Sequence, residues 1–361
     1  MAQDFGAINL SQGFPDFECP EKLKELVVHY LHDHKNQYPP MAGIPQLREQ
    51  IAHKVSTLYG FSADPDSEIT VTSGATEALF DAVQATVHAG DEVIMFDPAY
   101  DSYEPAVAMA GGEPVRLPLR LPDYSIDFDL LADSISDRTR LIIINSPHNP
   151  CGAILSREDL DALAAIIADK EITILSDEVY EHMVYDGEQH CSVLTHPQLR
   201  SRSFAVFSFG KTYHVTGWKL AYCVAAEPLS TEFRKVHQFV TFTTTSFLQY
   251  AIADFMAACP EHATDLSAFY QQKRDKFCAL LEGSRFKLNP SRGTYFQLAD
   301  YSEISDKSDM EFVTELTQEK GVAAIPLTPF YAEAPASRIV RFCFCKDDAT
   351  LEQAAEILCR I

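Results

Sequence analysis

The sequence predicts an α/β fold with a large sheet domain and a smaller α/β domain. Between residues 68 and 226, short apolar runs typical of strands alternate with stretches of helical periodicity. From Pro228 to Glu282 the pattern is that of a long helix broken near Pro260, and short strands (TYFQLAD, VAAIP and SRIVRFCFC) and two helices follow. A chain of 361 residues is longer than one ordinary core needs, which also favours a second domain.

Composition and charge narrow the function classes. The chain is 46% hydrophobic and 22% charged, as in globular proteins. Its formal charge of −23 argues against nucleic acid or an anionic membrane as a partner, because both need a basic surface. The nine cysteines have no zinc-binding spacing, and no apolar stretch has the length of a signal peptide or a membrane span. We therefore expect a cytoplasmic protein with reduced thiols and no metal site.

The first elements are interrupted by glycine and proline. A short strand from Ile8 leads into the loop QGFPDF and then into a helix over residues 18–33, with Pro20 near its start. The segment HKNQYPPMAGIP contains three prolines and a glycine, so it predicts a loop, and a helix follows from Gln46 to Tyr59. This loop is a candidate boundary between the two domains.

The next unit is a strand, a helix and a strand over residues 68–73, 75–90 and 91–97. Gly74 opens the helix, and Thr76 lies in its first turn. Backbone N–H groups and the helix dipole at such a start can bind an anion without a lysine. The alternative is an ordinary helix start that binds no ligand.

A proline-led turn after this strand carries two tyrosines, Tyr100 and Tyr103, and a helix that stops at residues 111–112. A tyrosine at this position usually packs or lines a rim, but it can also stack on a planar ligand. A strand over residues 113–119 and a short helix over residues 128–135 follow.

The apolar run RLIIIN predicts a strand buried on both faces, as in a parallel sheet, and it ends in the polar turn SPHNPCG. The X-Pro bonds at Pro147 and Pro150 of this turn can be cis. A helix over residues 156–170 comes next, with Ser156 as its cap and Asp159 three residues further on.

The strand over residues 171–176 runs directly into DEVYEH, so Asp177, Glu178 and Tyr180 emerge together at its end. Open α/β sheets bind their ligands at the carboxyl ends of strands. These carboxylates therefore indicate a site, and a capping role is the alternative.

The stretch SFAVFSFGKTYHVTGWK ends a buried strand at Ser208 and places Lys211 just beyond it, where a lysine is positioned for chemistry. The letters GKT resemble the end of a phosphate-binding P-loop, but that motif needs a glycine where Ala205 stands. A second lysine, Lys219, begins the next strand, over residues 219–226.

The order of these features is more specific than any one of them. A glycine-led helix start, a tyrosine after a strand, an Asn-Pro turn, Asp-x-x-Tyr, Ser-x-x-Lys and a late arginine follow one another along nearly the whole chain. In this the sequence resembles the fold type I pyridoxal-phosphate enzymes of the aspartate aminotransferase superfamily. NSPHNPCG and SFGKTYHVTGWK are the specific motifs, and QGFPDF points to the group of kynurenine, glutamine and bacterial methionine aminotransferases.

The resemblance implies a large domain with a mostly parallel seven-stranded sheet between helices, together with a smaller α/β domain. We expect residues 36–265 to form the large, cofactor-binding domain, and residues 1–35 and 266–361 to form the small one. The family also implies a homodimer with shared active sites.

The resemblance also implies the catalytic residues. Lys211 forms the Schiff base with the cofactor aldehyde and, once released, moves a proton as a base. Asp177 faces the pyridine nitrogen and keeps it protonated. Asn149 and Tyr180 correspond to the pair that binds the 3′-oxygen of the ring, and Tyr100 corresponds to the aromatic residue that stacks on it.

The cofactor phosphate is expected to bind at the start of the helix after residue 74. The residues that match the family's phosphate site are Gly74, Ala75, Thr76, Ser208 and Lys219. Many relatives outside the narrower group have arginine in place of Lys219, and a lysine supplies the charge without the two-pronged geometry. Tyr38 resembles a tyrosine that reaches the phosphate of the neighbouring subunit, and a purely local role is its alternative.

Arg341 corresponds to the arginine that binds the substrate α-carboxylate through two parallel donors. Asn149 and the backbone at Gly13 are expected near the same carboxylate. The aromatic residues Phe14, Tyr100 and Phe242 suggest an apolar or polarisable substrate side chain, as in methionine, glutamine or an aromatic amino acid. Relatives usually carry a further N-terminal segment that packs across the dimer and shapes this pocket. The resemblance therefore implies the residues that bind the cofactor, but it does not imply how the pocket closes.

Three functions are compatible with this reading. The first is an aminotransferase that works by two half-reactions with ping-pong kinetics. The second is β-elimination from cysteine conjugates, which needs no 2-oxo acid acceptor. The third is a non-catalytic pyridoxal-phosphate-binding regulator, which would need a DNA-binding module that this acidic chain lacks.

Overall fold

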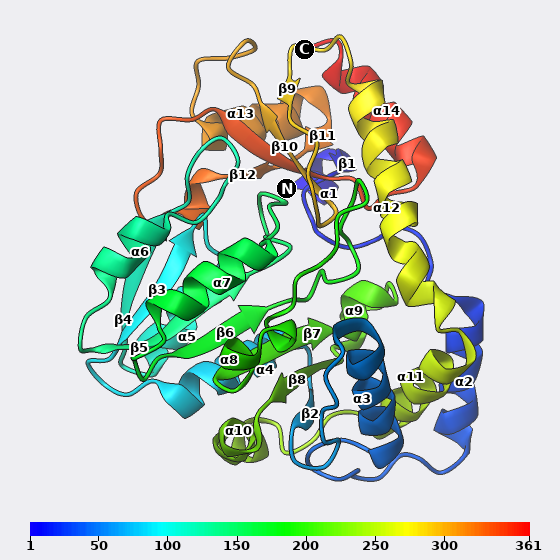
Figure 1. Cartoon of the computed structure of the whole chain (residues 1–361). Helices are drawn as coiled ribbons and strands as arrows, with labels where there is room; N and C mark the ends of the chain where they lie inside the picture. The colour runs from blue at the N-terminus through cyan, green and yellow to red at the C-terminus, as the bar shows by residue number, and fades with distance from the viewer.

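The computed structural model describes all 361 residues, and its larger sheet has seven strands in the order β2-β8-β7-β6-β5-β3-β4 (Figure 1). Neighbouring strands are parallel, except that β8 is antiparallel to both β2 and β7. This confirms the predicted fold class. The strands are β2 (Ile69–Thr72), β3 (Glu92–Asp97), β4 (Glu113–Pro118), β5 (Thr139–Asn145), β6 (Thr173–Asp177), β7 (Ser203–Ser208) and β8 (Ala221–Ala225).

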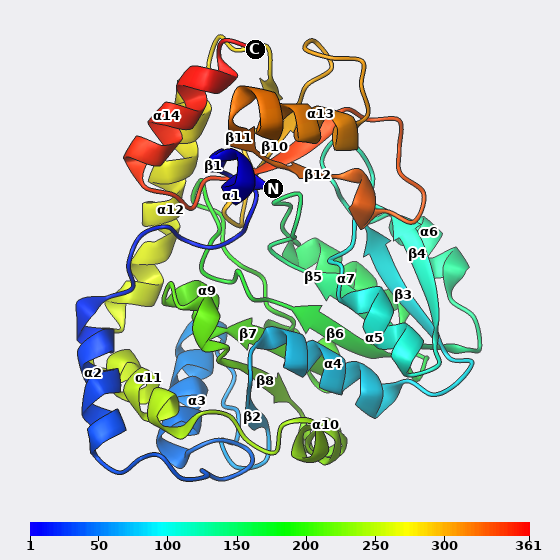
Figure 2. The ribbon, with the colours of Figure 1, turned by 180° about the vertical axis from the view of Figure 1, so that it is seen from behind.

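Apart from the edge strand β4, the large sheet is buried on both faces, because successive apolar side chains of a strand point to opposite faces. In β5, Leu141 and Ile143 belong to one core cluster, and Ile142 and Ile144 belong to the other. Figures 1 and 2 show the helices on the two faces from opposite sides. The first cluster is covered by α4 (Ala75–Thr86) and α5 (Tyr103–Met109), and the second by α3 (Pro45–Tyr59), α6 (Phe128–Ser134) and α7 (Arg157–Ile166).

A smaller antiparallel sheet has the order β12-β13-β10-β9, and β1 pairs in parallel with β11 beside it. The strand expected over residues 322–326 is therefore two strands, because the chain changes partner at Ala324. The elements are β1 (Ile8–Asn9), β9 (Lys287–Leu288), β10 (Phe296–Asp300), β11 (Val322–Ala323), β12 (Ile325–Pro326), β13 (Ile339–Cys343), α13 (Asp309–Glu315) and α14 (Asp348–Leu358).

The region predicted as one helix broken near Pro260 is three helices. The predicted break is present, but residues 241–245 interrupt the helix as well. Phe242 has a φ of +70° and threonines surround it, so the chain leaves the helix between α10 (Glu227–Val240) and α11 (Ser246–Ala258). The helix α12 (Glu261–Leu280) then runs from the large sheet to the small one (Figure 1). The expected limit at residue 265 falls inside it, and the domain limits stay a prediction.

Several local predictions are confirmed. Ser156 Oγ accepts a hydrogen bond from Asp159 N at 3.1 Å, and Asp159 Oδ2 accepts one from Ser156 N at 2.7 Å. The peptide bonds before Pro147 and Pro150 are cis. The remaining helices are α1 (Ala2–Phe5), α2 (Glu21–His32), α8 (Pro197–Arg200) and α9 (Phe209–Thr212).

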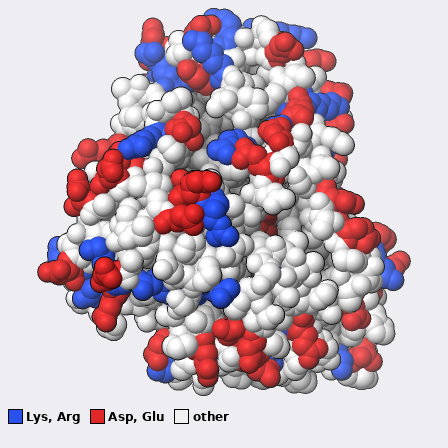
Figure 3. Space-filling view, viewed as in Figure 1, with Lys and Arg blue, Asp and Glu red and all other residues white.

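Acidic side chains outnumber basic ones on the surface, as the net charge of −23 requires. On the face shown in Figure 3, lysine and arginine side chains are scattered among more numerous acidic ones and form no continuous patch. None of the helices has the length and apolar character needed to cross a membrane.

Candidate active site

A cavity of about 390 Å³ lies at the carboxyl ends of β5, β6 and β7. Parallel strands place the residues that follow them at one edge of the sheet, and the register aligns Asn145 of β5 with Asp177 of β6. Phe14, Tyr38 and Phe242, which were expected near the site, do not line this cavity. Glu178 does not line it either, because its carboxylate accepts hydrogen bonds from Ser176 Oγ at 2.8 Å and Val193 N at 3.1 Å. The other expected residues do line the cavity. Those that line it are Gly13, Gly74, Ala75, Thr76, Tyr100, Asn149, Asp177, Tyr180, Ser208, Lys211, Lys219 and Arg341.

Lys211 lies in the single turn of α9, which follows β7 without a loop. Ser208 caps this turn, because its Oγ accepts a hydrogen bond from Lys211 N at 3.4 Å. Lys211 Nζ donates to Tyr295 Oη at 2.7 Å and to Gly13 O at 3.4 Å. Burial lowers the pKa of the amine to about 8. A sizeable fraction of the amine is therefore neutral near physiological pH, as a nucleophile or base must be.

Asp177 is the last residue of β6 and is buried in the cavity wall. Tyr103 Oη donates to its Oδ2 at 2.7 Å, and Val179 N donates to its Oδ1 at 3.3 Å. Burial raises the pKa of this carboxyl to about 6, and the hydrogen bond from Tyr103 opposes that rise. The sequence placed Tyr103 near the site because it follows Tyr100, but no feature of the sequence indicated that its hydroxyl donates to Asp177.

The start of α4 and Lys219 form a site for an anion. Gly74 is the N-cap with a φ of +86°, and no side chain caps the helix there. A Cβ on Gly74 would lie 3.0 Å from Lys219 Cε and 3.1 Å from its Nζ, so the ammonium group lies directly against the helix start. Bare N–H groups, the helix dipole and a cation favour the anion-binding interpretation over the ordinary helix start.

A buried ion pair fixes the first turn of α4. Glu77 accepts a hydrogen bond from Ser73 N and lies 2.7 Å from His237 Nδ1, while His237 Nε2 lies 3.0 Å from Met41 O. Burial alone would lower the pKa of His237, but the neighbouring carboxylates of Asp81, 3.6 Å away, and Glu77 outweigh it and raise the pKa to about 9. The charged ring therefore donates from both nitrogens and ties α4 to α10 and to the loop at Met41.

Arg341 is buried on β13 and has no acidic partner. Its Nη1 donates to Asn149 Oδ1 at 2.7 Å and its Nη2 to Ser11 O at 3.4 Å, whereas its Nε has no hydrogen-bond partner. The guanidinium carbon lies 3.9 Å from the ring centroid of Phe296 and 5.4 Å from that of Phe330. A buried guanidinium with a free donor can bind a carboxylate that enters the cavity.

The aromatic residues that were expected near the site but do not line the cavity lie on the surface of this chain. The side chain of Phe14 is 40% exposed, and Lys346 Nζ lies over its ring at 4.7 Å. Tyr38 is 84% exposed and packs edge to face on Phe242, with ring centroids 5.4 Å apart. Sequence reasoning missed Tyr295 and Phe330, because no motif connects them to the residues that they meet here.

These groups fit pyridoxal phosphate, the cofactor implied by the resemblance. The start of α4, the hydroxyl groups of Thr76 and Ser208 and the Lys219 ammonium can bind a phosphate dianion. Lys211 offers an amine for the aldehyde, and Asp177 offers a buried acid for the pyridine nitrogen. Tyr100 supplies an aromatic wall.

Comparisons with a family model and with known proteins all identify the same family. Residues 6–358 match the family "Aminotransferase class I and II". The chain is 52% identical to a methionine aminotransferase of Escherichia coli, over 99% of this chain and 93% of that protein. It is 36% identical to human kynurenine–oxoglutarate transaminase 3, over 99% of this chain and 86% of that protein.

Solved structures agree with these relatives. A crystal structure of YbdL from E. coli, reported as identifying a methionine aminotransferase function, has a TM-score of 0.98 at 52% identity and covers 100% of this chain and 94% of that one. N-succinyldiaminopimelate aminotransferase from Mycobacterium tuberculosis has a TM-score of 0.96 at 36% identity and covers 99% of this chain and 94% of that one.

Proposed function

The chain belongs to the class I and II aminotransferase family, and from that membership we propose that its preferred amino donor is L-methionine. It is a pyridoxal-phosphate-dependent transaminase that moves an amino group from an L-amino acid to a 2-oxo acid. The observation that supports methionine is 52% identity to a methionine aminotransferase. In addition, Phe296 and Phe330 lie against Arg341, and a thioether packs well against aromatic rings.

The proposed roles of the cavity residues follow from their positions. When bound, pyridoxal phosphate supplies an aldehyde for the amino group and a ring that stabilises the electron pair left at the substrate α-carbon. Lys211 would supply the amine that binds the aldehyde, and when free its Nζ would accept the proton from the substrate α-carbon. Asp177 would pair with the pyridine nitrogen, and its negative charge would keep that nitrogen protonated.

The remaining residues bind and orient the cofactor and the substrate. Asn149 and Tyr180 would hold the ring oxygen by hydrogen bonds, and Tyr100 would supply an aromatic face for the ring. The backbone of Gly74 and Ala75 and the side chains of Thr76, Ser208 and Lys219 would hold the phosphate. Arg341 binds the substrate carboxylate, with Asn149 and the backbone of Gly13 beside it, and so fixes the direction of the α-hydrogen.

A panel of amino donors against several 2-oxo acid acceptors tests the substrate proposal. We expect kcat/KM to be highest for L-methionine, with glutamine and aromatic amino acids as weaker donors, and the initial-rate plots to show ping-pong kinetics. A donor of another class with a higher kcat/KM would overturn the methionine assignment. Full-rate formation of pyruvate and ammonia from cysteine conjugates without an acceptor would indicate a lyase.

The Arg341→Ala substitution tests the carboxylate-binding role. We expect kcat/KM for the amino donor to fall by roughly 10- to 150-fold, which corresponds to about 1.5–3 kcal/mol for a charged hydrogen bond. Cofactor content should not change, because Arg341 contacts no residue of the proposed phosphate site. Arg341→Lys is the matched control, and it should recover only part of the loss because it keeps the charge without the paired donors. Loss of the cofactor in Arg341→Ala would contradict the assignment.

We further propose a homodimer in which Tyr38 reaches the phosphate of the partner's site. Exposed aromatic side chains on the loop at Tyr38 and around the end of α10 support this: Tyr38 is 84% exposed, Phe239 is 86% exposed and Phe242 is 41% exposed. Such a cluster is typical of a covered interface. The nine free cysteines support a cytoplasmic location.

Hybrid dimers test the shared site. Tyr38→Ala and Lys211→Ala each damage the site, but a mixed dimer contains one site with both residues intact. Random mixing makes half of the dimers hybrids with one good site of two, so we expect activity to recover to about a quarter of the wild-type level. No recovery in a sample shown by light scattering to be dimeric would contradict the shared site.

A further inference from the structure

Tyr295 is a buried tyrosine in direct contact with Lys211, and neither its position in the sequence nor the family resemblance assigned it a role. Its hydroxyl oxygen lies 2.7 Å from Lys211 Nζ and 2.6 Å from Gly13 O. Lys211 Nζ also lies 3.4 Å from Gly13 O, so the three polar groups meet beside the cavity, which Lys211 and Gly13 line.

The direction of these hydrogen bonds is determined by the acceptors. Gly13 O can only accept, so the single hydrogen of the Tyr295 hydroxyl points to it. The oxygen of Tyr295 must then accept from Lys211, whose second N–H points to Gly13 O. Burial raises the pKa of the Tyr295 phenol well above its usual value, so the hydroxyl keeps its hydrogen.

In a neutral amine bonded in this way, the lone pair on Nζ has a fixed direction. Two N–H bonds and the bond to Cε occupy three of the four directions around Nζ, and the lone pair takes the fourth. Because both hydrogens are turned towards Tyr295 and Gly13, the lone pair is directed away from them. An amine held by one acceptor would rotate about the Cδ–Cε and Cε–Nζ bonds, and its lone pair would have no fixed direction.

We propose that Tyr295 is a positioning residue for the proton transfer: together with Gly13 O it binds the released amine of Lys211 and directs its lone pair at the α-hydrogen of the substrate. This rests on the proposed role of Lys211 as the base. In the step, the C–H bond of the substrate breaks and an N–H bond forms on Lys211. The electron pair of the C–H bond stays with the substrate.

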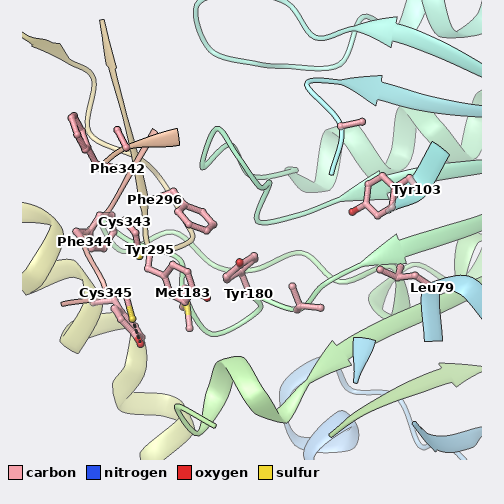
Figure 4. Packing of buried hydrophobic residues seen from close by; sticks show 14 of the residues in the cluster. Leu79, Tyr103, Tyr180, Met183, Tyr295, Phe296, Phe342, Cys343, Phe344 and Cys345 are labelled. Atoms are coloured by element: carbon pink, nitrogen blue, oxygen red, sulfur yellow. Dashed lines mark hydrogen bonds between the residues drawn. The ribbon is translucent and has the colours of Figure 1, made fainter. Parts of the chain in front are cut away.

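The surroundings of Tyr295 keep its hydroxyl in place. Its ring packs on Tyr180, Phe296 and Tyr270 with centroids 5.1, 4.9 and 5.8 Å away, and Figure 4 shows Tyr180, Tyr295 and Phe296 grouped together. Gly13 approaches closely because it has no side chain, since a Cβ there would lie 2.6 Å from Phe296 Cζ. Tyr295→Phe therefore removes the hydroxyl and retains the packing.

Tyr270→Phe is the matched control. Tyr270 is also a buried tyrosine in the same aromatic group, but its hydroxyl lies 3.2 Å from Cys345 Sγ and makes no hydrogen bond with Lys211. Both variants lose one buried hydroxyl from neighbouring rings. Only Tyr295→Phe loses the contact with Lys211.

The experiment measures the loss of deuterium from L-[α-²H]methionine in single-turnover mixing with the holoenzyme. We expect Tyr295→Phe to load cofactor and form the borohydride-reducible link like the wild type, yet to remove deuterium about 10- to 100-fold more slowly. The acidic limb of its pH–rate profile should move to lower pH, because a lost acceptor destabilises the protonated amine. Tyr270→Phe should match the wild type in all three measurements.

Equal rates in Tyr295→Phe and Tyr270→Phe would overturn the proposal. If Tyr295→Phe does not load cofactor, 3-fluorotyrosine at position 295 replaces it, since this residue retains the hydroxyl but makes it a weaker acceptor. A rate unchanged by 3-fluorotyrosine overturns the proposal equally. Where the wild type itself leaves L-methionine untouched, the substrate assignment fails, and the same comparison is made with the deuterated donor that the wild type accepts.

Discussion

Lys211→Ala is expected to abolish transamination, with a fall in the rate of about 10⁴-fold or more. The substitution removes the only amine that lies at the carboxyl end of β7 within the cavity, and with it both the covalent bond to the cofactor and the base. The visible absorption of the cofactor bound through that amine, and its loss on borohydride reduction, should both disappear. Half-reaction kinetics and absorption spectra of the purified variant measure these effects.

Lys235→Ala is the control for this substitution. Lys235 lies on the exposed side of α10 and pairs with Glu232 at 2.6 Å, and it does not line the cavity. It should keep both the absorption and the activity. A Lys211→Ala protein with wild-type absorption and turnover would show that another amine holds the cofactor.

Asp177→Asn is expected to lower kcat/KM by roughly 10³-fold, the scale for losing one preorganised electrostatic contact in an active site. Asparagine keeps the size and can still accept from Tyr103, whose Oη donates to Asp177 at 2.7 Å. It carries no charge to keep the pyridine nitrogen protonated. Asp177→Glu is the matched variant that keeps the charge at a changed distance, and a partial recovery is expected. An Asp177→Asn enzyme with unchanged kcat/KM would contradict the role.

The pH dependence of cofactor binding isolates the charge on Asp177. Burial raises the pKa of Asp177 to about 6 in the cofactor-free protein, so the carboxyl is neutral below that pH and cannot pair with a protonated pyridine. The affinity of the wild type for pyridoxal phosphate should therefore fall as the pH drops through about 6. Lys211, with a pKa of about 8, makes the affinity for the cofactor change with pH at higher pH as well, and the wild type and Asp177→Asn share that change. Equilibrium titrations should show that Asp177→Asn lacks only the fall near pH 6.

The residues that the sequence predicted are those that follow strands. Asp177 ends a mostly apolar strand, Asn149 and Lys211 lie within four residues of strand ends, and parallel strands carry such residues to one edge of the sheet. Their position could therefore be predicted before any contact was known. The family resemblance added their roles, and it alone selected Arg341 from the other arginines.

The contacts between remote segments could not be predicted in this way. Tyr295 and Lys211 are separated by 84 residues, and Gly13 and Tyr295 by 282. Such pairs depend on how the small sheet packs against the large one, and strand and helix patterns carry no information about that packing. The break at Phe242 was missed for a related reason, because a left-handed backbone angle at a non-glycine residue leaves no pattern in the sequence.

The most direct measurement of the central claim is peptide mapping of the borohydride-reduced holoenzyme by mass spectrometry. Reduction makes the bond between the cofactor and its lysine permanent. We expect one modified peptide, with the pyridoxyl group on Lys211 and none on the neighbouring cavity lysine, Lys219. A pyridoxyl group on Lys219, or on a lysine outside the cavity, with Lys211 unmodified, would contradict the account.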